Sequence, residues 1–473
     1  MEKDESISKI VPISDSARSS EVRSSDSVDG ERLTRMGYKP ELKRNLGIAS
    51  LLGFGFSVTN SWWGGERVFG SRHPERRTSS HDLWPYIYCV PLGGQYYWAG
   101  QIAPKKYARP LAFLTGALGW AGAMFASSSV TLGLASSLVG LYALGHPEFI
   151  ISPWMVFVTY QLVNAFGLVF NCFHRILPAL STGSLYISII AWLVTTILVP
   201  AVSNTKQPAE FVFATFINQT GWDSNVIAFI VGLVSPSWCF AALDVVTHMA
   251  EEIHQPERMI PRTILITVLI GLVSSLTYTI AMVFSITNFK AVAGSATGVP
   301  ILELYYEATR SLAGAIGLHV LFLLTGFGCL IGCHSWQTRL AWSFSRDHGL
   351  PGSQWWSVVN AITGVPLNAH LMSCAWVALL GCLFIASSTA FNRVYCLSLS
   401  FVFRPSSLPP DPCLVFFSFP FVMPIAPGNM NYVSVVIVGY VVYLCGYWYI
   451  RGRHVFRVPE VDGGPIIRSK GGA

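Results

Sequence analysis

The chain has 473 residues, of which 52% are hydrophobic and only 12% are charged. Soluble domains carry about 25% charged residues, so this composition excludes a water-soluble protein of this size. The formal net charge of +6 is small, and no basic cluster with interleaved aromatic residues points to a nucleic-acid partner.

The first segment, residues 1–44, is rich in Ser and in charged residues and has no apolar period. Such a composition predicts a disordered tail. Because no apolar stretch lies near Met1, we expect no cleaved signal peptide, and membrane targeting falls to the first span.

Long apolar runs without charge follow, and crossing a bilayer takes about 20 such residues. The runs are 45–65, 111–145, 149–172, 177–204, 224–243, 264–288, 311–333, 367–392 and 413–450. Prolines between 420 and 427 divide the last run, which leaves a final helix over about 432–450. We predict an all-α polytopic membrane protein with about 10 spans, a transporter-sized domain over 45–456 and a tail over 457–473.

Positive charge in short loops sets the orientation of such a protein. The loops expected inside carry Lys39, Lys43, Arg44, Lys105, Lys106, Arg109, Arg175, Arg258, Arg262, Arg339, Arg346, Arg451, Arg453 and Arg457. The loops expected outside carry fewer: Lys206, Lys290 and Arg310. Both termini are therefore expected in the cytoplasm. The sequon at Asn218 falls in an outside loop and is a candidate glycosylation site.

Two segments do not fit this alternation of spans. A span is needed within 66–92, but its first part is dense in Arg, Glu and Asp, and each Arg at the bilayer centre costs about 2.5–3.5 kcal/mol. The apolar remainder is short and contains Pro85 and Pro91. The second segment, 393–412, is apolar at first and then rich in proline after Arg404.

Several motifs are recognisable. They are GGQYYW at 93–98, APK at 103–105, DVVTHMAEE at 244–252, PER at 256–258, IPR at 260–262, SFSRDHGLP at 343–351, SFPF at 418–421 and NMNY at 429–432. Together they resemble the fungal amino-acid permeases, the amino-acid/choline/GABA transporters of the amino acid–polyamine–organocation superfamily. The resemblance covers 45–65, 93–392 and 413–456.

This resemblance implies a LeuT-like fold of two inverted five-helix repeats with two extra C-terminal helices, in which helices one and six unwind near the membrane centre. The chain departs from the family where the alternation of spans also fails. The second helix is replaced by 66–92, and part of the tenth and eleventh helices is replaced or missing in 393–412. A gene-model error and a decayed gene both explain these departures.

The expected break in helix one is the glycine-containing segment 53–57. Glycine lets the backbone leave the helix and offer N–H and C=O groups to a ligand. The alternative is close helix packing through small residues. The candidate substrate-binding residues here are Gly53, Phe54, Gly55, Ser57 and Asn60.

In helix six the expected break is the segment 235–238, because Pro236 removes a backbone hydrogen bond. Freed helix ends can hold a carboxylate or an ammonium, and Trp238 and Phe240 offer ring faces to an amine. A simple kink, with both rings in ordinary packing, is the alternative. The candidates here are Ser237, Trp238 and Phe240.

Acidic and basic residues follow the sixth span. Asp244 ends an uncharged run, so it is either buried and functional or already at the membrane surface. Bidentate Arg–carboxylate pairs suit a latch that breaks and reforms, whereas the alternative is a solvated cytoplasmic loop. The coupling and gating candidates are Asp244, Glu251, Glu252, Arg258 and Arg262, with Arg346 and Asp347 assigned to the other repeat.

The remaining candidates are weaker. Trp62 and Trp63 suit interfacial anchors. Cys329 and Cys333 lie one helical turn apart, but no His or acid completes a zinc set, so small core side chains are the better interpretation and we expect no metal and no cofactor. His319 is the only histidine well inside an apolar run and has no acid one turn away, which argues against a membrane-embedded enzyme.

The functional expectation is a secondary active transporter that moves an amino acid or a related amine, such as GABA, choline or a polyamine. The resemblance implies proton-coupled uptake, with the plasma membrane as the location and the vacuolar membrane as the alternative. The second hypothesis is a non-transporting sensor or a degenerate permease remnant with the same fold. The expected partners are a small amine solute, protons and lipid, with no nucleic acid.

Overall fold

The computed structural model describes residues 41–63, 95–214, 222–232, 238, 240, 242–295, 297–386 and 433–457. Residues 1–40 of the predicted tail, both anomalous segments, Asn218 and Ser237 lie outside these ranges. The predictions that concern them therefore remain predictions.

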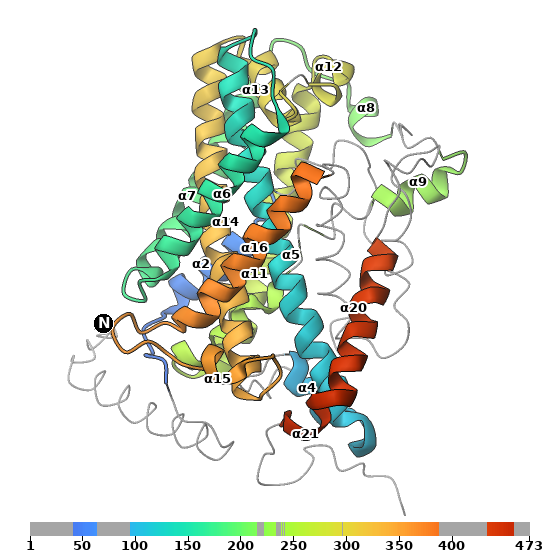
Figure 1. Cartoon of the computed structure of the whole chain (residues 1–473). Coiled ribbons are helices and arrows are strands. Elements are labelled where there is room, and N and C mark those ends of the chain that lie inside the picture. Colours follow the sequence, from blue (N-terminus) through green and yellow to red (C-terminus); the bar gives the residue numbers. More distant parts are fainter. Residues whose placement is uncertain are drawn as a thin grey trace, which may run out of the picture.

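The described chain is a bundle of long helices without a β-sheet (Figure 1). The long helices are α5 (Lys105–Gly145), α6 (Pro153–Asn171), α7 (Leu177–Val202), α11 (Pro256–Ser285), α14 (Leu312–Arg346), α16 (Leu367–Ala386) and α20 (Val433–Tyr447), which η5 (Trp448–Gly452) and α21 (Arg453–Val455) extend. Six helices of the described part are long and apolar enough to cross a membrane, and α16 and α2 (Ile48–Thr59) are shorter apolar helices. The predicted all-α polytopic membrane fold is confirmed.

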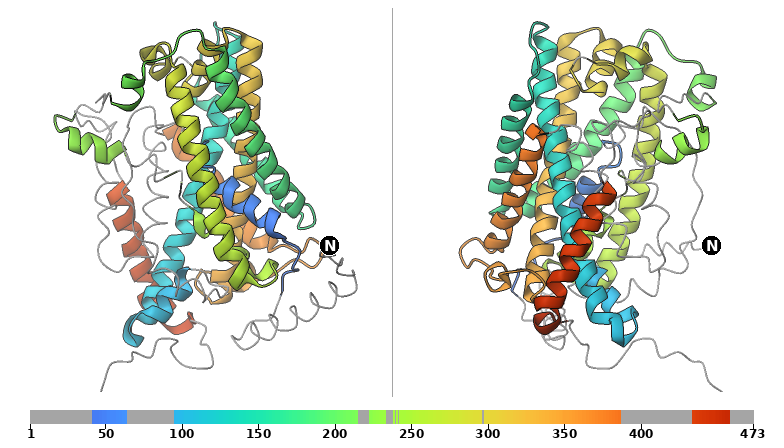
Figure 2. Two further views of the ribbon diagram at one scale, coloured as in Figure 1. Left: turned by 180° about the vertical axis from the view of Figure 1, so that it is seen from behind. Right: turned by 45° about the vertical axis from the view of Figure 1, so that its right-hand side comes forward.

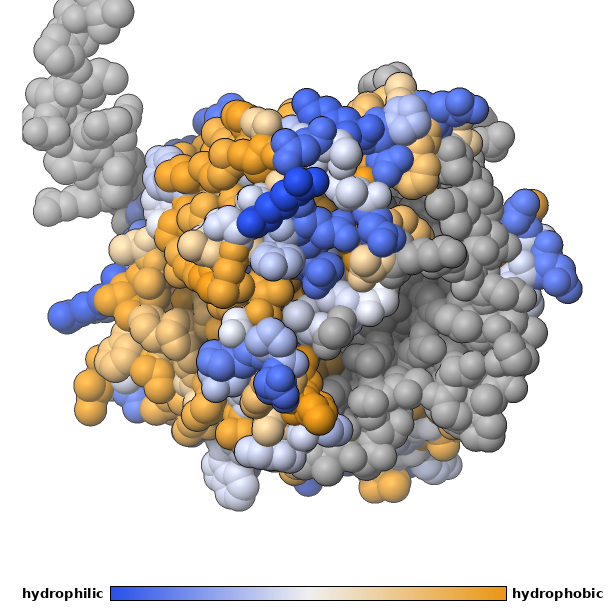
Figure 3. Space-filling model, turned by 90° about the horizontal axis from the view of Figure 1, so that it is seen from above, coloured by the Kyte–Doolittle hydropathy of each residue, from blue (hydrophilic) through white to orange (hydrophobic). Residues whose placement is uncertain are grey.

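Burial separates a central pair of helices from a peripheral set. In α5 and α14, 67% of the most apolar window is buried, whereas the corresponding share is 17–28% in the other four candidate spans. The outer helices expose large apolar side chains such as Leu162, Ile197 and Leu265. Seen from above, hydrophobic side chains lie along the flank and hydrophilic ones gather over the end of the bundle (Figure 3). The apolar flank of the bundle is therefore suited to contact lipid, which explains why so few charged residues are needed to cover it.

Shorter elements cover the two ends of the bundle. α8 (Ala209–Phe213), α12 (Phe289–Ala293) and α13 (Pro300–Thr309) lie at the upper end in Figure 1, and α4 (Gln95–Ile102), α15 (Ser353–Trp356) and α21 lie at the lower end. Two views from other sides keep α20 beside α5 (Figure 2). Lys105 and Arg453, counted above as inside charges, belong to the lower end, and Arg310, counted as outside, ends α13 at the upper end.

Local sequence explains where α14 begins and why it is long. The Ser311 side chain accepts a hydrogen bond from the Gly314 N–H, which caps the first turn. The apolar run was expected to end near 333, but the helix continues to Arg346 because its last polar turns are buried in the bundle. Arg339 is therefore a helical residue, which corrects its placement in a loop.

α2 lies against α7 at very short range. A Cβ on Gly53 would lie 2.2 Å from the carbonyl oxygen of Ser181, so only glycine fits at this crossing. Ser181 in turn donates its hydroxyl to the Ser50 carbonyl at 2.6 Å. Small residues thus bring the two backbones together, as in other membrane helix pairs.

We expect Gly53→Ala to destabilise the protein by about 1–3 kcal/mol, because the new methyl group would force the backbones of α2 and α7 apart. The matched control is Gly183→Ala, since a Cβ at Gly183 of α7 has open space around it. Thermal unfolding of the purified proteins in detergent measures the difference. Equal melting temperatures for the two variants would show that this crossing is not tight.

Candidate functional site

The structure places the end of α2 several residues beyond the predicted break. The helix is continuous through Gly53–Ser57 and ends at Asn60, which adopts a left-handed conformation with φ 36° and ψ 52°. The prediction of unwinding at 53–57 is therefore wrong. Tight packing holds this segment helical, because Gly53 contacts α7 and Gly55 faces the Thr267 hydroxyl of α11. The two glycines instead serve close helix packing, which was the alternative interpretation. Phe54, between them, is buried.

The segments from helix one and helix six nevertheless converge. A Cβ on Gly271 of α11 would lie 2.5 Å from Ser61 Oγ and 3.3 Å from Phe240 Cε1, so both side chains meet the same point of α11. Ala242 follows with a positive φ of 61°, and the 3-10 helix η3 (Leu243–Glu252) begins after it. α9 (Asn225–Gly232) precedes this point. Helix six is thus not one continuous α-helix, although the segment around Pro236 lies outside the described residues.

Polar atoms without partners collect at the end of α2. Asn60 is 1% exposed, yet neither its amide nitrogen nor its oxygen has a hydrogen-bond partner among the described residues. The Ser57 hydroxyl, one helical turn earlier, is buried and likewise has no partner there. Buried polar groups are normally paired, so an unpaired set marks a place where a ligand or water supplies the partner.

Aromatic rings lie next to these polar atoms. Trp62 and Trp63 are buried in the bundle, which corrects their assignment as interfacial anchors. Trp62 packs edge-to-face on Tyr278 at 5.1 Å, and Trp63 stacks on Phe322 at 5.3 Å between ring centroids. The Trp62 indole also donates a hydrogen bond to Ser188 of α7 at 3.0 Å. Phe240 and Trp238 are partly buried.

Asp244 lies in the first turn of η3 and is largely buried. Its Oδ2 is 3.3 Å from Nε2 of His248, one turn later in the same helix. Its Oδ1 has no hydrogen-bond partner among the described residues. The two side chains thus form a polar pair in the first turns of η3.

The far end of η3 carries two buried ion pairs, which we call the ionic cluster: Glu251, Glu252, Arg339 and Arg346. Arg346 donates to Glu251 at 2.6 Å. Arg339 donates through Nε to one oxygen of Glu252 and through Nη2 to the other at 2.9 Å, a bidentate arrangement. His174, between α6 and α7, lies 3.7 Å from Glu252. The ionic cluster therefore joins η3 to α14.

Other parts of the chain contact the ionic cluster and the neighbouring Asp347. Leu46, before α2, donates its N–H to the Glu252 carbonyl at 3.1 Å. Tyr96 of α4 donates its hydroxyl to Asp347 at 2.7 Å, and the Arg457 N–H donates to the Asp347 carbonyl at 3.1 Å. The lower end of the bundle is thus tied together by residues from the beginning, middle and end of the chain.

Glu251 contacts Arg346, as a gating network would require, and Glu252 pairs with Arg339, a residue that the prediction missed. The gating role itself stays a prediction. Arg339 was counted as a loop cation, and its spacing of seven residues from Arg346, two helical turns, was the signal that could have found it. Arg258 and Arg262 are exposed in the first turns of α11 and lie outside the ionic cluster. In a fold of two five-helix repeats η3 and α14 both fall in the second, so the assignment of Arg346 and Asp347 to the other repeat is wrong.

Burial changes the titration of this end of the molecule. It raises the pKa of Glu251 to about 7, and neighbouring Glu252 adds to the effect while Arg346 opposes it. Burial also lowers the pKa of His174. Glu251 lies outside the six candidate spans, where protons from water can reach it when the contacts open.

A sequence model of the amino acid permeases matches residues 92–448. The chain is 42% identical to the choline transporter of Saccharomyces cerevisiae, over 93% of this chain and 87% of that protein. It is 33% identical to the 7-keto 8-aminopelargonic acid transporter of the same yeast, over 72% of this chain and 70% of that protein. The crystal structure of MhsT in complex with L-phenylalanine aligns at a TM-score of 0.46 and 11% identity, over 85% of this chain and 87% of that one.

We expect Arg339→Met to destabilise the protein by about 3–5 kcal/mol, because it leaves the Glu252 carboxylate buried without its partner. The double variant Arg339→Met with Glu252→Gln removes both charges and should recover most of the loss. Thermal unfolding in detergent compares the two with Arg258→Met, an exposed control. If the double variant were the less stable of the two, the buried charge would not be the cause.

The Glu251 carboxyl should make stability depend on pH. Its pKa in the folded arrangement lies above its value in water, so proton uptake stabilises this arrangement at low pH, and the contribution is lost as the pH rises through about 7. The wild type should therefore lose stability between about pH 5 and about pH 7 relative to Glu251→Gln, which cannot ionise. Melting temperatures across this range measure the effect, and parallel curves would contradict it.

Proposed function

The chain belongs to the amino acid permease family. On that premise we propose that it carries a small organic cation with an ammonium group, choline foremost, into the cell. The chain is a membrane transporter and not an enzyme, as its family and named relatives show. The identity of the substrate, the coupling to protons and the location in the plasma membrane are parts of the proposal.

The proposed substrate rests on the 42% identity to a protein named as a choline transporter, along nearly the whole chain. The second relative carries a solute with both an amine and a carboxylate, which makes an amino-acid-like zwitterion the competing candidate. The two classes differ in whether a carboxylate has to be bound.

The end of α2 supports a cation. Indole rings attract quaternary ammonium groups through their negative faces, and Trp62, Trp63 and Phe240 gather near the end of the helix. A choline-like cation also has one hydroxyl, and the unpaired amide of Asn60 can both donate to it and accept from it. No Arg or Lys of the described chain takes part in the contacts found at this point, where a substrate carboxylate would call for a positive group.

The ionic cluster supports a gate at the end that the distribution of Lys and Arg assigns to the cytoplasm. On this proposal the cluster and the Leu46 contact hold that end closed. Release of substrate inward would require these contacts to break. Asp244 with His248, and Glu251 through its raised pKa, are the groups proposed to couple this step to protons.

Uptake of labelled choline by proteoliposomes tests the proposal, with an inward proton gradient and with the gradient collapsed. We expect concentrative uptake that excess unlabelled choline abolishes and that an amino-acid mixture leaves in place. Asp244→Asn should abolish concentration of the substrate while the protein still inserts, with Arg258→Gln as an exposed control.

Preferential inhibition by amino acids would move the substrate to the zwitterion class. Unchanged concentrative uptake by Asp244→Asn would remove Asp244 from the coupling mechanism. If the correctly inserted protein transports none of these solutes and shows no counterflow, the sensor or remnant hypothesis replaces the transporter of choline.

A further inference from the structure

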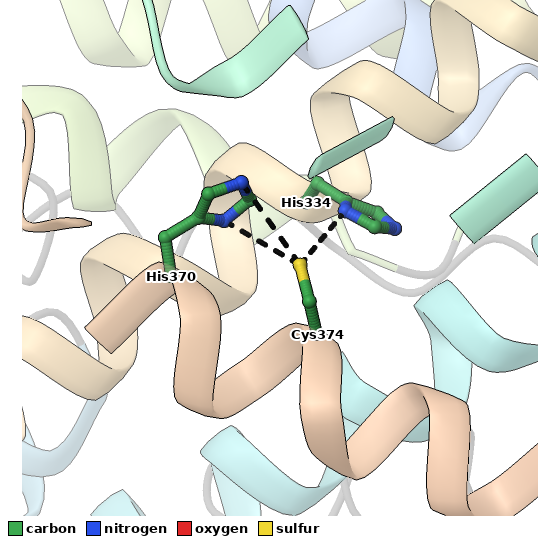
Figure 4. Close-up of side chains that lie close together, drawn as sticks. All are labelled: His334, His370 and Cys374. Carbon is green, nitrogen blue, oxygen red and sulfur yellow. Dashed lines mark hydrogen bonds between the residues drawn. The ribbon is translucent and has the colours of Figure 1, made fainter. Parts of the chain in front are cut away.

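Three buried side chains with metal-binding atoms meet where α14 packs on α16. His334 comes from α14, and His370 and Cys374 lie one turn apart on α16 (Figure 4). One ligand atom from each lies within 4.8 Å of the others, and all three residues are buried. None of them takes part in the transport steps proposed above.

The distances are those of a metal site that has not closed. Cys374 Sγ lies 3.4 Å from His334 Nδ1 and 3.7 Å from His370 Nδ1. Around a metal with bonds of about 2.3 Å to sulfur and about 2.0–2.1 Å to nitrogen, sulfur and nitrogen are about 3.6–3.8 Å apart. Only the separation of the two rings has to shrink, and each ring turns about a single bond.

The hydrogen bond to the backbone fixes the tautomer of His370 and leaves Nδ1 as the nitrogen with a free lone pair. Its Nε2 lies 3.0 Å from the Leu168 carbonyl, which can only accept, so the ring proton is on Nε2. Such a bond to the second nitrogen is the usual support of a metal-ligating histidine. The Thr338 hydroxyl lies 2.8 Å from Nδ1 but also 2.6 Å from the His334 carbonyl, and it has one proton for these two acceptors.

The surroundings are built around His334. A Cβ on Gly167 of α6 would lie 2.8 Å from Cε1 of the ring, so the glycine leaves the room that the imidazole occupies. His334 Nε2, Gln337 Oε1 and Asn164 Oδ1 are buried without hydrogen-bond partners among the described residues. Two amide oxygens near the three ligands are thus available to accept a hydrogen bond or to bind a cation.

Charge selects the ion. A thiolate with two neutral imidazoles carries one negative charge, so a monovalent cation makes a neutral assembly, whereas a divalent one leaves a positive charge among apolar helices. Thiolate and imidazole are soft and borderline ligands, which suit Cu(I). We propose that His334, His370 and Cys374 form a buried Cu(I) site that ties α16 to α14. Binding forms the Cu–S and Cu–N bonds, and the thiol proton of Cys374 goes to water.

The test uses the full chain purified in detergent without oxygen, with Cu(I) supplied as its bicinchoninate complex. Cys329 and Cys333 lie 4.0 Å apart and could themselves hold Cu(I), so the measurement is made on the wild type and on the variant Cys329→Ser with Cys333→Ser. We expect this variant to retain one ion per chain, with X-ray absorption showing sulfur and nitrogen ligands.

Adding Cys374→Ser or His334→Ala to that variant should remove the ion, whereas Cys382→Ser, an exposed thiol two turns further along α16, should leave it bound. A folded chain that binds no Cu(I) overturns the proposal, and this result needs no further variant. Binding that survives Cys374→Ser also overturns it, and preferential retention of Zn²⁺ in competition overturns the choice of ion.

Discussion

The burial of charge at one end of the helical bundle is the constraint on which the rest of this structure depends. Two carboxylates and two guanidinium groups lie where water is largely excluded, and they are tolerated only because each has its partner. This requirement fixes η3 against α14 and keeps α14 helical well past its apolar run. It also draws in the chain before α2 through Leu46 and the chain after α21 through Arg457. The polar end is therefore as specifically packed as the apolar middle.

The sequence was sufficient for the class of fold, because an apolar run of sufficient length has few alternatives to a membrane helix. It also brought Glu251 and Arg346 into one candidate network, without saying which acid pairs with which base, and the two residues are in contact. It failed where packing decides the outcome. Glycines that permit unwinding equally permit close contact, and only the position of Ser181, far away in the chain, determines that Gly53 is held in a helix.

The other errors have the same origin. Tryptophans beside a span suit a membrane interface, but the end of α2 lies inside the bundle, so Trp62 and Trp63 pack against Tyr278 and Phe322 instead. Of the His/Cys group, the sequence shows only that His370 and Cys374 share one face of a helix. The third member, His334, arrives through the packing of α14 on α16, which no spacing along the chain records.

The form of η3 has a mechanical consequence. A 3-10 helix rises about 2.0 Å per residue and an α-helix about 1.5 Å, so the ten residues of η3 are about 5 Å longer than they would be as α-helix. Rewinding would shorten the segment and turn its side chains about its axis at the same time. Such a change would move Glu251 and Glu252 relative to the arginines of α14. In the described structure η3 is thus in the longer of these two helical forms, and two ion pairs hold its far end to α14.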